Sequence, residues 1–183
     1  MRKVALLSVD FQRGFDDPIW GVRNNLDAEE KMALLLSEWR DRNFPIIHIQ
    51  HCSIEENSPL RPELPGNEFK DEAKPLLGEK VFTKAVNSAF IGTELEKYLL
   101  ENNIESLVIA GLTTDHCVST TTRMAGNLGF QVTLVSDATA TFDRKGEDGT
   151  HYSADQIHKV HLASLNGEFC TVLTSKEVLS AIV

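Results

Sequence analysis

The sequence of 183 residues lacks any apolar run of membrane-spanning length. Its first apolar run, from Val4 to Val9, is interrupted by Asp10 and lacks the small-residue cleavage site of a secretory signal. It also has no cluster of Lys and Arg, and its formal net charge is -9, whereas proteins that bind a phosphate backbone need a basic surface. We therefore expect a soluble, cytoplasmic protein that binds neither membranes nor nucleic acid.

Cysteine is also scarce, and its pattern excludes a disulfide framework. The three cysteines, Cys52, Cys117 and Cys170, form no CxxC pair, and an odd number in a chain without a secretory signal indicates free thiols. With 42% hydrophobic residues, the chain is long enough for one substantial core and too short for two ordinary domains. We expect one domain over residues 1–183.

Short β-rich apolar runs alternate with stretches of helical spacing. The predicted strands are Val4–Val9, Ile46–Ile49, Lys80–Thr83, Ser106–Ala110, Val132–Val135 and Cys170–Leu173, and the predicted helices are Ala28–Arg42, Thr93–Asn102, Val118–Leu128 and Ser153–Asn166. Nearly continuous apolar runs suit parallel strands that are buried on both faces. The alternation predicts right-handed βαβ crossovers and a three-layer α/β/α fold.

A long irregular segment, Cys52–Gly78, interrupts this alternation. It contains Pro59, Pro62, Pro65 and Pro75 together with many charged residues. Long ordered loops in compact domains often form lids or bind substrate, and we expect one of these roles here.

Three side chains of complementary chemistry follow predicted strands. Asp10 follows the first strand, and Lys84 follows the run Lys80–Thr83. Cys117 lies a few residues beyond the strand that ends at Ala110, where the next helix should begin. Because ligands bind at the carboxyl ends of strands in a parallel α/β sheet, we expect the three groups to converge at one edge. Each residue alone is weak evidence, since a lone carboxylate, lysine or cysteine is more often structural.

The three groups together suit a thiol nucleophile. A thiol has an ordinary pKa of about 8.5, which a helix amino terminus and a nearby Lys can lower to roughly 3.5 to 7.5. Lys84 fits this role for Cys117, and Asp10 could hold the thiol proton and return it later. The sequence therefore predicts a nucleophile, a base and an electrostatic partner.

The segment from Gly111 to Val118 supports this interpretation. Gly111 permits a tight turn after the strand, and the amides that open the following helix would point toward an oxyanion beside the sulfur. An ordinary helix cap formed by Thr113, Thr114 or Asp115 remains the alternative.

These motifs resemble the isochorismatase-like cysteine hydrolases, which include nicotinamidases and carbamoylsarcosine amidases. The resemblance covers nearly the whole chain and rests on four segments: Val9–Gln12, Lys84–Phe90, Gly111–Val118 and Gly129–Ala138. It implies that Asp10 is the acid/base, Lys84 the charge partner and Cys117 the nucleophile. It also implies a cis peptide bond before Thr113, with the amides of Thr113 and Cys117 as the oxyanion hole.

The resemblance further implies a six-stranded parallel sheet with the Rossmann-like strand order 3-2-1-4-5-6 and a homo-oligomer, either a dimer or a tetramer. Nicotinamidases carry an Asp-x-His metal motif after the second strand, whereas this chain has His51 and Ser53 there. His48 and His51 would point to opposite faces of a strand. We therefore expect no metal and no cofactor.

Several other residues could contact a small-molecule substrate. Phe15, Trp20 and Phe90 are candidates for the pocket wall, with plain core packing as the alternative, and His51 and His116 could hydrogen-bond the substrate. The residues expected to be structural or solvated are Cys52, Cys170, Arg61, His158 and His161.

The sequence leaves three functions open. The leading hypothesis is hydrolysis of a small amide or related C–N bond through a thioester on Cys117. Cleavage of a vinyl ether with Asp10 as the general acid is the second. A binding protein that has kept the fold and lost activity is the third, and the intact trio argues against it.

Overall fold

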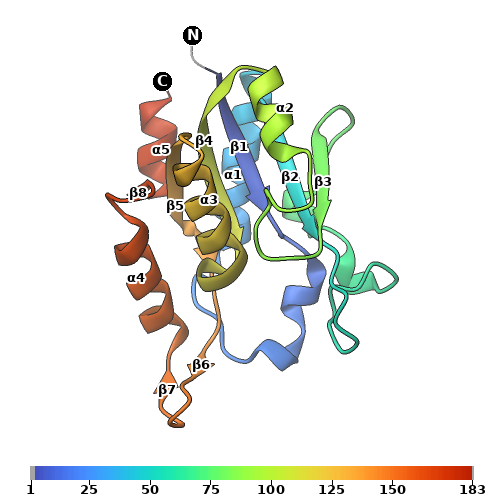
Figure 1. Cartoon of the computed structure of the whole chain (residues 1–183), viewed down its shortest axis with the longest axis vertical. Coiled ribbons are helices and arrows are strands. Elements are labelled where there is room, and N and C mark those ends of the chain that lie inside the picture. The colour runs from blue at the N-terminus through green and yellow to red at the C-terminus, as the bar shows by residue number, and fades with distance from the viewer. Residues whose placement is uncertain (1–2, 183) are drawn as a thin grey trace.

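The computed structural model describes residues 3–182, which contain a six-stranded sheet with helices on both faces (Figure 1). The sheet order is β3-β2-β1-β4-β5-β8, and all neighbouring strands are parallel. The strands are β1 (Lys3–Val9), β2 (Ile46–His51), β3 (Lys80–Lys84), β4 (Ile104–Leu112), β5 (Gln131–Ala140) and β8 (Thr171–Leu173). Counting only the strands of this sheet, the order is 3-2-1-4-5-6, so the predicted three-layer fold is confirmed.

Strand β1 explains why the apolar runs are nearly continuous. Successive side chains of a strand point to opposite faces of the sheet. Ala5, Leu7 and Val9 pack into one core and Leu6 into the other, and all four are fully buried. A central parallel strand therefore has no solvent-exposed face, and even Ser8 of β1 is fully buried.

The helices divide between these two cores. They are α1 (Ala28–Asp41), α2 (Leu95–Glu101), α3 (Ser119–Asn127), α4 (Ala154–Leu165) and α5 (Ser175–Ala181). Helices α2, α3 and α4 supply Leu99, Ala125 and Leu165 to one core. Helices α1 and α5 supply Trp39 and Val178 to the other. Figure 1 shows α3 in front of the sheet and α1 behind it.

The elements that the sequence did not predict include a helix and a hairpin. Helix α5 begins with a capping box, in which the Thr174 hydroxyl accepts from the Glu177 amide and the Glu177 carboxylate accepts from the Thr174 amide at 2.8 Å. A separate hairpin pairs β6 (Arg144–Lys145) with β7 (His151–Tyr152). Strands of two residues are too short to produce a hydrophobic period.

Within residues 3–182, no helix combines the length and the apolar character that a membrane crossing would need.

Candidate active site

Asp10, Lys84 and Cys117 meet at the carboxyl edge of the sheet. Asp10 directly follows β1 and has a positive φ of 55°, a conformation that non-glycine residues seldom adopt. Lys84 is the last residue of β3, and Cys117 lies in one π-helical turn, Thr114–Val118, between β4 and α3. Elements far apart in sequence thus place the three groups together, as the strand ends predict.

The Lys84 ammonium is the centre of the arrangement. Its Nζ lies 2.6 Å from Asp10 Oδ2, 3.2 Å from Cys117 Sγ and 3.0 Å from His51 Nδ1. The side chains of Asp10 and Lys84 are completely buried. Three acceptors surround the three N–H bonds of one ammonium, so its hydrogen-bonding capacity is filled.

The electrostatics of the resting site differ from the sequence prediction. Burial raises the pKa of the Cys117 thiol, the Asp10 carboxylate raises it further, and Lys84 only partly opposes the rise. Burial disfavours the ammonium of Lys84, but Asp10 and Cys117 outweigh burial and raise its pKa. The expectation that Lys84 lowers the thiol pKa below its ordinary value is therefore wrong for the resting site. The lysine charge is largely balanced by Asp10, so the buried thiol faces a nearly neutral ion pair.

One oxygen of Asp10 remains available. Its Oδ1 atom is buried and has no hydrogen-bond partner among the described residues. The thiol of Cys117 lies within 4.8 Å of a carboxylate oxygen of Asp10 and donates at 3.6 Å to Asn87 Oδ1. A buried carboxylate oxygen without a donor is suited to receive a proton during a reaction.

His51 is held in place through its backbone. Its N–H donates to Gln12 Oε1 at 2.7 Å, and its carbonyl accepts from Gln12 Nε2 at 2.9 Å and from Asn67 Nδ2 at 2.8 Å. Because Nδ1 accepts from the Lys84 ammonium, the ring hydrogen is on Nε2. Burial, together with Lys84, lowers the pKa of His51 and keeps its ring neutral.

The loop that carries Cys117 is tied down on both sides. The peptide bond between Leu112 and Thr113 is cis. Thr114 Oγ1 bonds to His158 Nδ1 of α4 at 2.8 Å, and the Asp115 carboxylate accepts from Arg144 Nε at 2.7 Å. These contacts connect the loop to the C-terminal third of the chain. His158, which we expected to be a packing or capping group, thus supports the loop through Thr114.

The same cluster has the donor types of a metal site. The ligand atoms of Asp10, His51 and Cys117 lie within 4.8 Å of one another. All three already contact the Lys84 ammonium, so a positive charge occupies the position between them. His48 lies on the other face of β2 and bonds to Glu79 at 2.8 Å.

A cavity of about 550 Å³ opens above Cys117. Phe15, Trp20, His51 and His116 line it, together with Thr113 and Cys117. Phe90 does not: its ring stacks on Phe130 at 6.1 Å and packs against the core. Phe90, which precedes α2, therefore packs against the core, as the alternative interpretation expected, and is not part of the cavity wall.

The irregular segment Cys52–Gly78 forms one side of this cavity. Ser53 and the residues from Glu55 to Leu60 line the opening. Asn67 anchors the segment through hydrogen bonds from its Nδ2 to the carbonyls of His51 and Leu60. Asn67 and Asn87 carried no signal in the sequence that we recognised as functional, since asparagine in loops is common.

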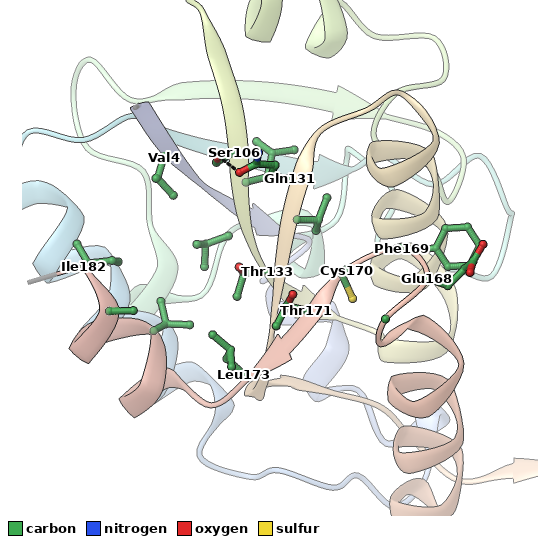
Figure 2. Close-up of a pocket in the computed structure, with 16 residues that line it drawn as sticks. Val4, Ser106, Gln131, Thr133, Glu168, Phe169, Cys170, Thr171, Leu173 and Ile182 are labelled. Atoms are coloured by element: carbon green, nitrogen blue, oxygen red, sulfur yellow. Dashed lines mark hydrogen bonds between the residues drawn. The ribbon is translucent and has the colours of Figure 1, made fainter. Parts of the chain in front are cut away.

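A second cavity, of about 630 Å³, lies at the opposite edge of the sheet, where the strands begin (Figure 2). Val4, Ser106, Gln131 and Thr171 come from the first residues of four strands. Figure 2 shows the sulfur of Cys170 beside the start of β8. Glu168 and Cys170 are the only acidic, basic or thiol side chains among the lining residues that the structure describes.

Comparisons with known proteins agree on one family. The isochorismatase domain matches residues 4–177. The uncharacterised isochorismatase family protein YrdC of Bacillus subtilis is 48% identical over 178 residues, covering 97% of this chain and 95% of YrdC. The crystal structure of an isochorismatase family protein from Chromobacterium violaceum is 48% identical, with a TM-score of 0.95 over 100% of this chain and 96% of that one. Maleamate amidohydrolase of Pseudomonas putida is 25% identical over 197 residues, covering 97% of this chain and 86% of the enzyme.

Proposed function

From the premise that the chain belongs to the isochorismatase family of hydrolases, we propose that it hydrolyses a small amide or related C–N bond through a thioester on Cys117. The observation that carries the proposal is the Lys84 ammonium, which joins the carboxylate of Asp10 to the thiol of Cys117 at the bottom of a cavity. Maleamate amidohydrolase, which is similar to this chain over 86% of its own length, is named as an enzyme that hydrolyses an amide.

The acylation step begins from a neutral thiol. Asp10 Oδ1 accepts the thiol proton as Sγ attacks the carbonyl carbon, and the carbonyl electron pair moves onto the oxygen. The amides of Thr113 and Cys117 hold this oxyanion. Asp10 then gives its proton to the nitrogen, the C–N bond breaks and the amine leaves.

The deacylation step reverses these roles. Asp10 accepts a proton from water, the resulting hydroxide attacks the thioester carbon, and the C–S bond breaks to release the acid. Sulfur leaves as a thiolate, which the proton held by Asp10 neutralises. Lys84 stays protonated throughout and stabilises whichever of the two groups, Asp10 or Cys117, carries the negative charge. No cofactor takes part.

His51 is the proposed polar contact for the substrate. Its Nε2–H has no hydrogen-bond partner among the described residues, and the residue lines the cavity. Since the contact with Lys84 fixes the tautomer, Nε2 of the ring donates a hydrogen bond to the substrate and does not accept one. Phe15, Trp20 and His116 complete the proposed wall around the substrate.

Ammonia release from a panel of small neutral primary amides tests the proposal, together with the intact mass of the protein at short reaction times. We expect turnover and an added acyl mass on the peptide that contains Cys117, absent in Cys117→Ala and present in Cys170→Ala. Absence of ammonia from every amide would contradict amide hydrolysis.

Two variants separate the amide reaction from vinyl ether cleavage. If Asp10 only protonated an ether, Cys117→Ala would retain most of the turnover on that substrate while Asp10→Asn would lose it. For the proposed thioester route, both variants lose turnover.

A further inference from the structure

The mouth of the cavity carries negative charge. Glu55 and Glu56 line the opening, and both residues are exposed. Their carboxylates take part in no ion pair or side-chain hydrogen bond within residues 3–182, although the Glu55 amide donates to Ser53 Oγ and the Glu56 carbonyl accepts from Arg61. Two unpaired carboxylates at an opening attract cations and repel anions.

Within residues 3–182, neither carboxylate forms an ion pair with a positive side chain. None of the described residues that line the cavity is Lys or Arg. Arg61 of the same segment donates to the Glu56 carbonyl at 3.0 Å, but its ion pair is with the Glu63 carboxylate. Lys84 lies below the floor of the cavity, and its charge is committed to Asp10. An anionic substrate would therefore find no Lys or Arg side chain in the described lining of the cavity.

Aromatic rings form the wall beside this mouth. The ring centroids of Phe15 and Trp20 lie 5.3 Å apart. Trp20 Nε1 donates to the Gly14 carbonyl at 2.8 Å, which fixes the orientation of the indole. Aromatic faces accept both apolar chains and cations.

We infer that the cavity prefers amides with an apolar chain that ends in a positive charge and discriminates against amides that carry a carboxylate. The amide group would lie at Cys117 and the charged end at Glu55 and Glu56. This inference rests on the proposed amide hydrolysis and names its substrate class.

Three amides of matched length test it: δ-aminovaleramide, which is cationic, hexanamide, which is neutral, and adipamate, which is anionic. We expect kcat/KM to fall in that order, by roughly threefold to tenfold for each step at low ionic strength. At high salt, the differences in kcat/KM between the three amides should become smaller. Equal or faster turnover of adipamate would overturn the inference.

The double variant Glu55→Gln, Glu56→Gln tests the cause. It should bring the cationic-to-anionic ratio close to one, while Glu101→Gln, a change at an exposed position near the start of β4, should leave the ratio unaltered. An unchanged ratio in the double variant would show that the two carboxylates do not select substrates.

Binding separates this inference from the proposed function. Dissociation constants of the three amides for Cys117→Ala, measured by calorimetry, should follow the same order without any chemistry. Turnover in the reverse order contradicts the charge preference alone. If no amide is turned over but binding follows the expected order, the proposed amide hydrolysis is contradicted. The inference that the cavity prefers cations then still holds.

Discussion

The two ends of the sheet each hold a cavity with a buried cysteine, and only one of them has the groups for catalysis. The cavities are of similar size, about 550 Å³ around Cys117 and about 630 Å³ around Cys170. Cys117 has the Lys84 ammonium at 3.2 Å and a carboxylate nearby. The charged group that acts on Cys170 is Arg123, whose guanidinium lies 4.7 Å from the centre of the Phe169 ring. A cavity and a thiol are therefore not sufficient, and the placement of charge distinguishes the two ends.

Topology explains the difference. At the carboxyl edge, the ends of neighbouring parallel strands and the segments that leave them bring Asp10, His51 and Cys117 together. At the amino edge, the strands begin with residues such as Ser106 and Gln131, whose side chains bond to each other at 3.4 Å. These two side chains therefore hydrogen-bond each other and form no reactive pair.

Replacing each cysteine by alanine should give the largest contrast. Cys117→Ala should lower kcat/KM for the best amide by at least about 10³-fold, because the nucleophile is removed. Cys170→Ala removes one buried sulfur far from the reaction and should change kcat/KM by less than about twofold per folded molecule. Steady-state kinetics with both variants, corrected for the folded fraction, makes the comparison. A large loss of kcat/KM in Cys170→Ala would contradict the assignment of the reaction to Cys117.

The buried ion pair should dominate stability at the catalytic end. Lys84→Met leaves the Asp10 carboxylate buried without its partner and should lower the free energy of unfolding by about 3 to 5 kcal/mol. Lys97→Met breaks an exposed pair with Glu94 and should cost less than about 1 kcal/mol. Urea unfolding of both variants gives the two values. The double variant Asp10→Asn, Lys84→Met should recover part of the loss, and no recovery would contradict the assignment of the cost to an uncompensated carboxylate.

Two glycines allow a similar comparison of the two ends. A Cβ at Gly111 would lie 2.2 Å from the Val9 carbonyl oxygen between β4 and β1, and a Cβ at Gly126 would lie 2.7 Å from the Phe169 carbonyl oxygen. Gly111→Ala should cost about 1 to 3 kcal/mol of stability and also displace the Cys117 loop, lowering kcat. Gly126→Ala should cost less, because alanine in a helix regains about 1 kcal/mol of propensity, and should leave kcat unaltered. Equal effects on kcat would contradict a local role for Gly111.

Hydrophobic patterning predicted most of the sheet. All six strands of the sheet were predicted, although β5 extends five residues beyond the predicted end at Val135. Burial on both faces explains the continuous apolar runs of central strands such as β1, whereas β3 is exposed at most of its positions. Helix α5 was missed, although Thr174 and Glu177 have the spacing of a capping box. The hairpin of β6 and β7 was missed because two residues per strand give no period.

The members of the candidate site were predictable, but their electrostatics were not. Asp10, Lys84 and Cys117 follow from the rule that functional residues lie at strand ends. The raised thiol pKa depends on which groups neutralise Lys84 and how deeply Cys117 is buried, and these are properties of the packed structure. Likewise, no sequence pattern shows that Phe90 turns toward Phe130 or that Asn67 holds His51.

The last comparison concerns how the pH response of stability depends on Cys170, at the amino edge of the sheet. Burial raises the pKa of Cys170 from 9.0 to about 11, with Arg123 opposing the rise. A thiol whose pKa is higher in the folded state favours folding while it is protonated, and this contribution is lost as pH rises from the unfolded value through the folded one. The free energy of unfolding of the natural protein should therefore fall more between pH 9 and pH 11 than that of Cys170→Ala. Urea unfolding of both proteins across this range in a reducing buffer measures the difference, and parallel curves would show that Cys170 does not respond to its burial in this way.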